Sequence, residues 1–204
     1  MQMFDSIIDL LPESIKNALE GITNINPVEE IRLRVNRPIE LITFEKKFFL
    51  DKTAKKEDIL HILNMGARNS LFAREEEIRN GFITVKGGSR IGFTGQAVRL
   101  DGNVKSLCNF NSLNIRFARE IKGCASFILP YIHNKDKLLS CLFIAPPGAG
   151  KTTLLRDLTR LISNGFDGTQ GIKTGLIDEG GEIAACLEGI PQLDIGLRLS
   201  LIHI

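Results

Sequence analysis

Residues 145–153, which read APPGAGKTT, constrain the fold of this chain more than any other feature. They match the phosphate-loop pattern G-x-x-x-x-G-K-[ST], with Ala145 in the place of the first glycine. The apolar run at 141–144 comes directly before the loop and predicts a buried parallel strand. Apolar residues at helical spacing follow the loop and predict a helix that ends at Gly165. A strand, a loop and a helix in this order are typical of an α/β nucleotide-binding domain.

The residue types of the loop suit the binding of phosphate. Gly148 and Gly150 allow a tight backbone curl whose N–H groups point at phosphate oxygens, and the start of the helix adds its positive dipole end. Lys151 is placed to reach the β- and γ-phosphates, and the Thr152 hydroxyl is placed to bind Mg²⁺. We therefore predict a site for ATP and Mg²⁺. Its expected nucleotide-binding residues are Pro147, Gly148, Ala149, Gly150, Lys151, Thr152 and Thr153.

Composition excludes several classes of protein. A hydrophobic content of 43% with 25% charged residues is typical of a globular protein, and the net charge of +2 gives no strong field for nucleic acid or membrane. The four cysteines are widely spaced and are expected to be reduced thiols of a cytoplasmic protein. No apolar run approaches the roughly 20 residues that span a bilayer, and we expect no signal peptide and no nucleic-acid partner.

The chain before the loop has the pattern of a separate α+β domain. Residues 28–35 alternate between apolar and polar side chains, as in a half-buried strand, and Gly87 and Gly88 mark a hairpin turn. A polar stretch at 134–137 is the expected junction, which gives an α+β N-terminal domain at 1–134 and a nucleotide-binding domain at 135–204. The expected elements are strands at 28–35, 39–44, 48–50, 82–86, 90–94 and 113–117, and helices at 56–65, 69–80 and 123–132.

Two acids follow the next apolar segment. Asp178 and Glu179 come directly after Leu176 and Ile177, at the end of an expected second core strand. Either carboxylate can act there as a catalytic group that orients water near the γ-phosphate. The alternative is that both acids cap a helix at 182–187. The sequence leaves these two hypotheses open.

A second strand that ends in aspartate, which normally supports the magnesium ion, is harder to find. Leu193 and Asp194 form too short a run, and residues 199–204 are apolar without a following acid. The segment after Lys151 is also too short for a complete P-loop core. We therefore expect the sequence to be incomplete at its C-terminal side, with weak hydrolysis or none.

Several runs in order resemble the stage III sporulation protein AA family, over residues 10–198. The resemblance implies an α+β N-terminal domain followed by an incomplete α/β RecA-like P-loop ATPase domain of the secretion type. It further implies a homo-oligomer, hexameric in the full-length protein, with sporulation-channel proteins as partners at the inner face of a membrane. The family usually has arginine at Gly180 and a different sequence after Arg198, so we expect residues 199–204 to be foreign to it. The matching runs are 30–38, 81–92, 112–120, 146–157 and 177–184.

Arginines of the N-terminal domain are a further hypothesis of the resemblance, because in secretion-type ATPases such residues can fold over the nucleotide. Arg116 and Arg119 precede the expected junction by a short tether and are the candidate arginine fingers. The alternative for Arg116 is an ion pair with Glu120. The residues expected on a solvated strand face are Arg32, Arg34 and Arg37.

Three other functions stay open. A P-loop kinase needs an acceptor site and a lid that the sequence does not display. A nucleotide-binding scaffold without hydrolysis has the same loop. A RecA-like nucleic-acid motor is disfavoured by the near-neutral charge.

Overall fold

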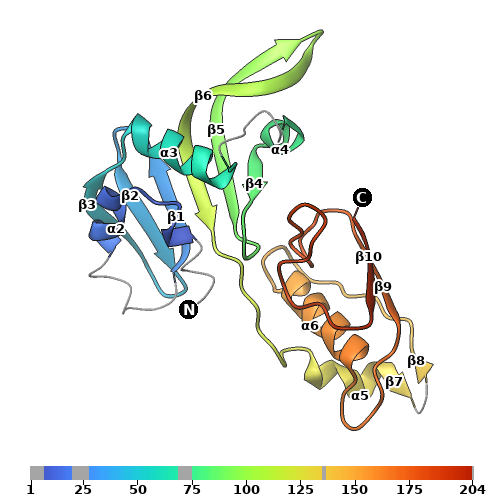
Figure 1. Ribbon diagram of the computed structural model, residues 1–204. Coiled ribbons are helices and arrows are strands. Elements are labelled where there is room, and N and C mark those ends of the chain that lie inside the picture. Colours follow the sequence, from blue (N-terminus) through green and yellow to red (C-terminus); the bar gives the residue numbers. More distant parts are fainter. Residues whose placement is uncertain (1–6, 20–27, 69–74, 135–136, 204) are drawn as a thin grey trace. The chain divides into compact units, whose positions relative to one another are not determined.

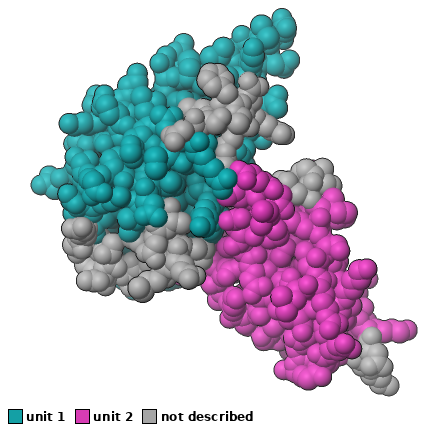
Figure 2. All heavy atoms as spheres, viewed as in Figure 1, with its two compact units in different colours: residues 1–118 teal, residues 119–204 magenta. Residues whose placement is uncertain are grey.

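A computed structural model describes residues 7–19, 28–68, 75–134 and 137–203. The chain divides into two compact units, unit 1 at Met1–Ala118 and unit 2 at Arg119–Ile204 (Figure 2). We expected the junction near residue 134. The division falls earlier because Ala125 and Leu129 belong to the same buried cluster as Leu158, on the helix that follows the loop.

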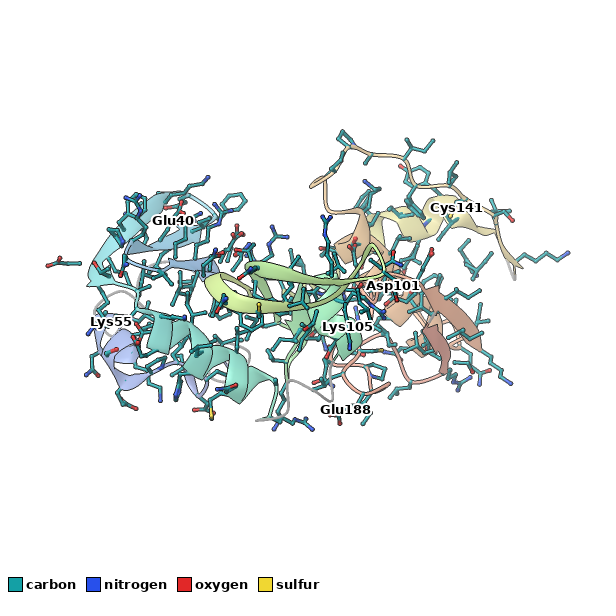
Figure 3. The ribbon with its side chains drawn as sticks, turned by 90° about the horizontal axis from the view of Figure 1, so that it is seen from above. Glu40, Lys55, Asp101, Lys105, Cys141 and Glu188 are labelled. Atoms are coloured by element: carbon teal, nitrogen blue, oxygen red, sulfur yellow. The ribbon has the colours of Figure 1, made fainter. Side chains whose placement is uncertain are left out.

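Unit 1 is built on a six-stranded sheet in the order β3-β2-β1-β6-β5-β4 (Figure 1). Every neighbouring pair is antiparallel. The two long strands β5 and β6 form a hairpin that extends past the other strands and turns at Asp101, which Figure 3 labels. The alternating pattern predicted the strands, but β5 and β6 are both much longer than the expected 90–94 and 113–117. The strands are β1 (Val28–Arg34), β2 (Pro38–Thr43), β3 (Lys47–Thr53), β4 (Phe82–Thr84), β5 (Arg90–Leu100) and β6 (Asn103–Arg116).

Among the described residues of unit 1, three helices pack with the sheet, and one face of the sheet forms the core. The helices are α2 (Glu13–Leu19), α3 (Lys56–Gly66) and α4 (Glu75–Asn80). Ile31 and Leu33 of β1 point into this core with Ile59 of α3, and all three are fully buried. Part of the helix expected at 69–80 lies outside the described residues. Burial of one sheet face under helices is the arrangement that the alternating strands require.

The opposite face of the sheet is polar and held by ion pairs. Glu30 of β1 forms ion pairs with two arginines. Arg32 lies on the same strand, and Arg116 lies opposite Glu30 on β6. Glu40 of β2, labelled in Figure 3, accepts from Arg34 at 3.2 Å. The strand arginines thus lie on a polar face, as expected, but with carboxylate partners.

Unit 2 centres on α6 (Lys151–Asn164), the helix that follows the loop. β9 (Thr174–Asp178) and β10 (Leu199–His203) form a two-stranded parallel sheet, in register from Thr174 with Leu199. Phe143, Leu154 and Leu161 are partly buried against the cluster around Leu158. The remaining elements are η2 (Ser126–Ile128), α5 (Leu129–Ile132), β7 (His133–Asn134) and β8 (Lys137–Leu138).

Two expectations for unit 2 were wrong. Residues 141–144 form no strand. Among the described residues β9 pairs with β10 alone, so this segment has no neighbouring strand to pair with. Leu142 and Ile144 are consequently 83% and 85% exposed. The helix expected at 182–187 is replaced by turns, with Ala185 at a φ of 49° that a helix does not allow.

Candidate nucleotide-binding site

The loop before α6 has the backbone geometry that a phosphate loop needs. Gly148 has a φ of 78°, and Gly150, the residue that caps α6, has a φ of 86°. Side chains are disfavoured in this left-handed region, so glycine is required at both positions. A Cβ atom at either glycine would meet no other atom within 4 Å, so the space beside the loop is open. The predicted curl and the start of the helix at Lys151 are confirmed.

Lys151 is folded back onto its own loop. Its ammonium group donates to the carbonyl oxygens of Ala145 at 2.6 Å and Pro146 at 2.9 Å. These are neutral acceptors, which bind an ammonium less strongly than a phosphate dianion does. A phosphate oxygen would therefore be a stronger acceptor for this ammonium group than either carbonyl oxygen.

Thr152 meets a carboxylate that the sequence analysis did not assign to the site. Its hydroxyl Oγ1 donates to Oε2 of Glu182 at 3.3 Å. Glu182 lies four residues after the end of β9, within the segment that was expected to be a helix. Only the turn geometry brings it back to the start of α6, and no spacing in the sequence signals this contact.

Asp178 has its carboxylate occupied by the backbone. The side chain is buried, with 4% exposure, and accepts the N–H groups of three consecutive residues at 2.9–3.0 Å. Oδ1 accepts from Glu182, and Oδ2 accepts from Ile183 and Ala184. These contacts are of the capping kind, although they cap a turn. Glu179, the other acid predicted to be catalytic, is exposed.

Arg156 holds the carbonyl side of the same segment. It is buried on α6, and its guanidinium donates to the carbonyl oxygens of Ile183 at 2.6 Å, Glu182 at 2.7 Å and Arg119 at 3.0 Å. Burial lowers the pKa of Arg156, while Glu120 and neighbouring carboxylates act in the opposite direction. The guanidinium still remains charged, because the ordinary pKa of arginine lies far above neutral pH.

Asp157, the next residue of α6, ties the helix to residues 123–125. It accepts the N–H of Ala125 at 2.9 Å and is paired with Arg160 at 2.6 Å. Burial raises the pKa of this carboxyl group, but the hydrogen bonds from Ala125, Arg160 and Gly123 together hold the pKa below its ordinary value.

The two candidate arginine fingers have different surroundings. Arg116 ends β6, and its Nε lies 3.6 Å from Glu30 Oε2, with 68% of the side chain exposed. Glu120, the alternative partner of Arg116, accepts the backbone N–H of Asp194 within unit 2. Arg119 is exposed at the beginning of unit 2, where its carbonyl oxygen accepts from Arg156.

The donor atoms at the start of α6 suit magnesium. A threonine hydroxyl and a carboxylate are hard oxygen ligands, and Mg²⁺ in nucleotide sites uses one or two such groups together with phosphates and water. The described residues contain no group of three or more His, Cys, Asp or Glu side chains that could hold a metal by itself. A magnesium ion that binds together with a nucleotide would not need such a group, because phosphates and water supply the other ligands beside Thr152 and Glu182.

Comparisons with known proteins confirm the family resemblance that the sequence runs predicted. The protein named "Stage III sporulation protein AA" of Bacillus subtilis (strain 168) is 42% identical over 200 residues, which are 97% of this chain and 65% of that protein. The chain thus spans about two thirds of the length of this relative. The X-ray structure of the Legionella pneumophila ATPase DotB superposes with a TM-score of 0.49 at 13% identity, over 95% of this chain and 51% of that chain, which is too weak a similarity to assign a fold. No helix among the described residues is long and apolar enough to cross a membrane.

The profile of the family described as "Sporulation stage III, protein AA" matches residues 1–204. The match includes 199–204, the segment that we expected to be foreign to the family. In the structure this segment supplies β10, in register with β9. With the loop, the β9 acids and this segment inside one continuous match, the chain belongs to the Sporulation stage III, protein AA family.

Proposed function

We propose that this chain binds ATP at the loop before α6 and belongs to an ATPase that acts in endospore formation. The observation that carries the proposal is the loop itself. Two glycines in left-handed conformations lead into α6, and Lys151 at its first turn donates to two neutral carbonyl oxygens. Backbone N–H groups at a helix start, joined by one lysine, favour the binding of a phosphate chain.

Magnesium is the expected companion of the nucleotide. When bound, the ion neutralises charge on the β- and γ-phosphates. Thr152 and Glu182 would hold it, directly or through water, because their oxygen atoms already lie 3.3 Å apart at the start of α6. Pro147, Ala149 and Thr153 complete the proposed set of nucleotide contacts from the loop and the first turn of α6.

The larger role is a proposal from family membership. The curated relative is named for stage III of sporulation. We propose a homo-oligomer, hexameric in the full-length protein, that works with sporulation-channel proteins at the inner face of a membrane. Arg116 and Arg119 remain proposed arginine fingers, and the RecA-like character of unit 2 remains part of the same proposal.

A nucleotide-binding scaffold without hydrolysis is the second candidate. The specific observation in its favour is Asp178, whose two oxygens are taken by three backbone donors and are therefore poorly placed to activate water. Measurement of ATP turnover beside ATP binding separates the two candidates.

Titration with a fluorescent ATP analogue tests the binding site. Lys151→Ala removes the lysine of the loop that faces the phosphates in the proposed complex, so affinity should fall at least tenfold. Lys173→Ala is the matched control, since Lys173 is an exposed lysine outside the loop and should leave affinity unchanged. Equal affinities for Lys151→Ala and the unmodified chain, with both folded, would remove the loop from the proposal.

A further inference from the structure

The segment that carries Glu182 is held from both sides of its backbone. On one side, the Asp178 carboxylate accepts the N–H groups of Glu182, Ile183 and Ala184. On the other side, the Arg156 guanidinium donates to the carbonyl oxygens of Glu182 and Ile183. The peptide groups around Glu182 are thus fixed by one buried anion and one buried cation.

This double attachment determines where the Glu182 side chain lies. Glu182 sits in a turn, without helix or strand hydrogen bonds to fix its direction. Asp178 comes from the end of β9, and Arg156 comes from α6, the same helix that carries Thr152. Arg156 therefore joins the Glu182 segment to the helix on which the phosphate loop ends.

The two contacts of Arg156 on this segment also use the shape of the guanidinium. Nε donates to Ile183 and a terminal nitrogen donates to Glu182, at 2.6 and 2.7 Å. A planar fork can serve two neighbouring carbonyl oxygens at once, whereas a lysine ammonium is a flexible point charge. The third contact, to the carbonyl of Arg119, fixes the guanidinium from another side.

We infer that Arg156 is a positioning residue for the magnesium-linked step of nucleotide binding, and that it acts by holding Glu182 beside Thr152. The inference rests on the proposed function, because it concerns the same site. Arg156 faces the backbone and not the loop, so its side chain is not expected to touch the nucleotide. Its removal should leave the affinity for magnesium-free nucleotide unchanged and weaken the response to magnesium.

The principal variant is Arg156→Met, which keeps an apolar stem in the buried position and removes all donors. We measure the affinity for a fluorescent ATP analogue first in EDTA, without free Mg²⁺, and then at rising Mg²⁺ concentrations. The value compared between variants is the Mg²⁺ concentration that gives half of the total gain in affinity. Mutation of a group that orients a metal ligand typically weakens metal affinity by about 10- to 100-fold. We expect a shift of that order for Arg156→Met and for Glu182→Gln, and an intermediate value for Arg156→Lys.

Arg160→Ala is the matched control. Arg160 is another arginine of α6 and is partly buried, and its side chain pairs with Asp157. It should keep the wild-type magnesium response within about twofold. A wild-type response in folded Arg156→Met, or equal shifts in Arg156→Met and Arg160→Ala, would overturn the inference. If Arg156→Met does not fold, Arg156→Lys carries the test, and a wild-type value for it overturns the inference.

A second measurement keeps this inference separate from the proposed function. Amide hydrogen exchange of residues 182–184 is followed in the ligand-free chain, where no nucleotide is needed. Loss of Arg156 should raise their exchange rates about tenfold or more, and Arg160→Ala should not. If the unmodified chain fails to bind nucleotide, the proposed function fails. If the exchange rates do not respond to Arg156→Met, the positioning role fails by itself.

Discussion

Asp178 offers the sharpest prediction, because the two hypotheses for it lead to different results. As a cap, it stabilises the turn at 182–184, and Asp178→Ala should destabilise unit 2. As a general base, it should be needed for turnover and matter little for stability. The structure allows the first effect to be calculated from its three hydrogen bonds.

The three bonds do not contribute equally. The bond from Ala184 is buried, and the loss of a buried bond to a charged group costs about 1.5–3 kcal/mol. The bonds from Glu182 and Ile183 are partly buried, so water can replace the carboxylate, and each contributes about 0.5–1 kcal/mol. Relief from the burial of a carboxylate offsets part of this sum. Asp178→Ala should therefore lower the free energy of unfolding of unit 2 by about 2–4 kcal/mol.

Asp178→Asn should cost less. Its single carbonyl oxygen can still accept from Ile183 and Ala184, whereas its amide group faces the N–H of Glu182 as a second donor. A loss of about 1–2 kcal/mol is expected, since one bond and the charge are removed. The free energy of unfolding should therefore fall in two steps of similar size, from aspartate to asparagine and from asparagine to alanine.

Hydrogen exchange with mass spectrometry along a urea series measures this effect, because peptides from each unit can be followed separately. Unit 1 serves as an internal reference. Glu179→Ala is the control, as this exposed neighbour should change stability by less than about 0.5 kcal/mol. The reasoning is refuted if Asp178→Ala stays within about 0.5 kcal/mol of the unmodified chain. Lost turnover with unchanged exchange at 182–184 would establish the general-base role instead.

The remaining predictions concern acid stability and the arginine fingers. The hydrogen bonds of Asp157 hold its folded pKa below the unfolded value of about 3.9, so the stability that it adds is present above that pH. This stability should be lost as the pH falls through the lower, folded pKa; urea unfolding of unit 2 between neutral and acidic pH should show the loss, and Asp157→Asn should reduce this dependence. For Arg116 and Arg119, alanine variants of a form of the protein that turns over ATP should lower turnover at least tenfold at one position, with ATP affinity kept. Wild-type turnover in both variants would point to a docking role for these residues.

Much of unit 1 follows from its sequence, because its strands have one buried face. Ile31 and Leu33 alternate with charged side chains, which defines both the strand and the face that turns inward. Gly87 and Gly88 are the turn between β4 and β5, as the hairpin pattern predicted. The pairing of β1 with β6 is different, since these strands are far apart in the sequence and only tertiary contacts bring Glu30 opposite Arg116.

In unit 2 the sequence by itself determined the loop. Glycine at 148 and 150, lysine at 151 and a following helix are local requirements, and local rules are enough to predict them. The place of Glu182 was decided only by tertiary structure. Its contact with Thr152 depends on a turn that Asp178 and Arg156 hold from different elements. A buried cation and a buried anion that bind backbone groups leave no periodic pattern in the sequence, because backbone N–H and C=O groups are the same at every such position.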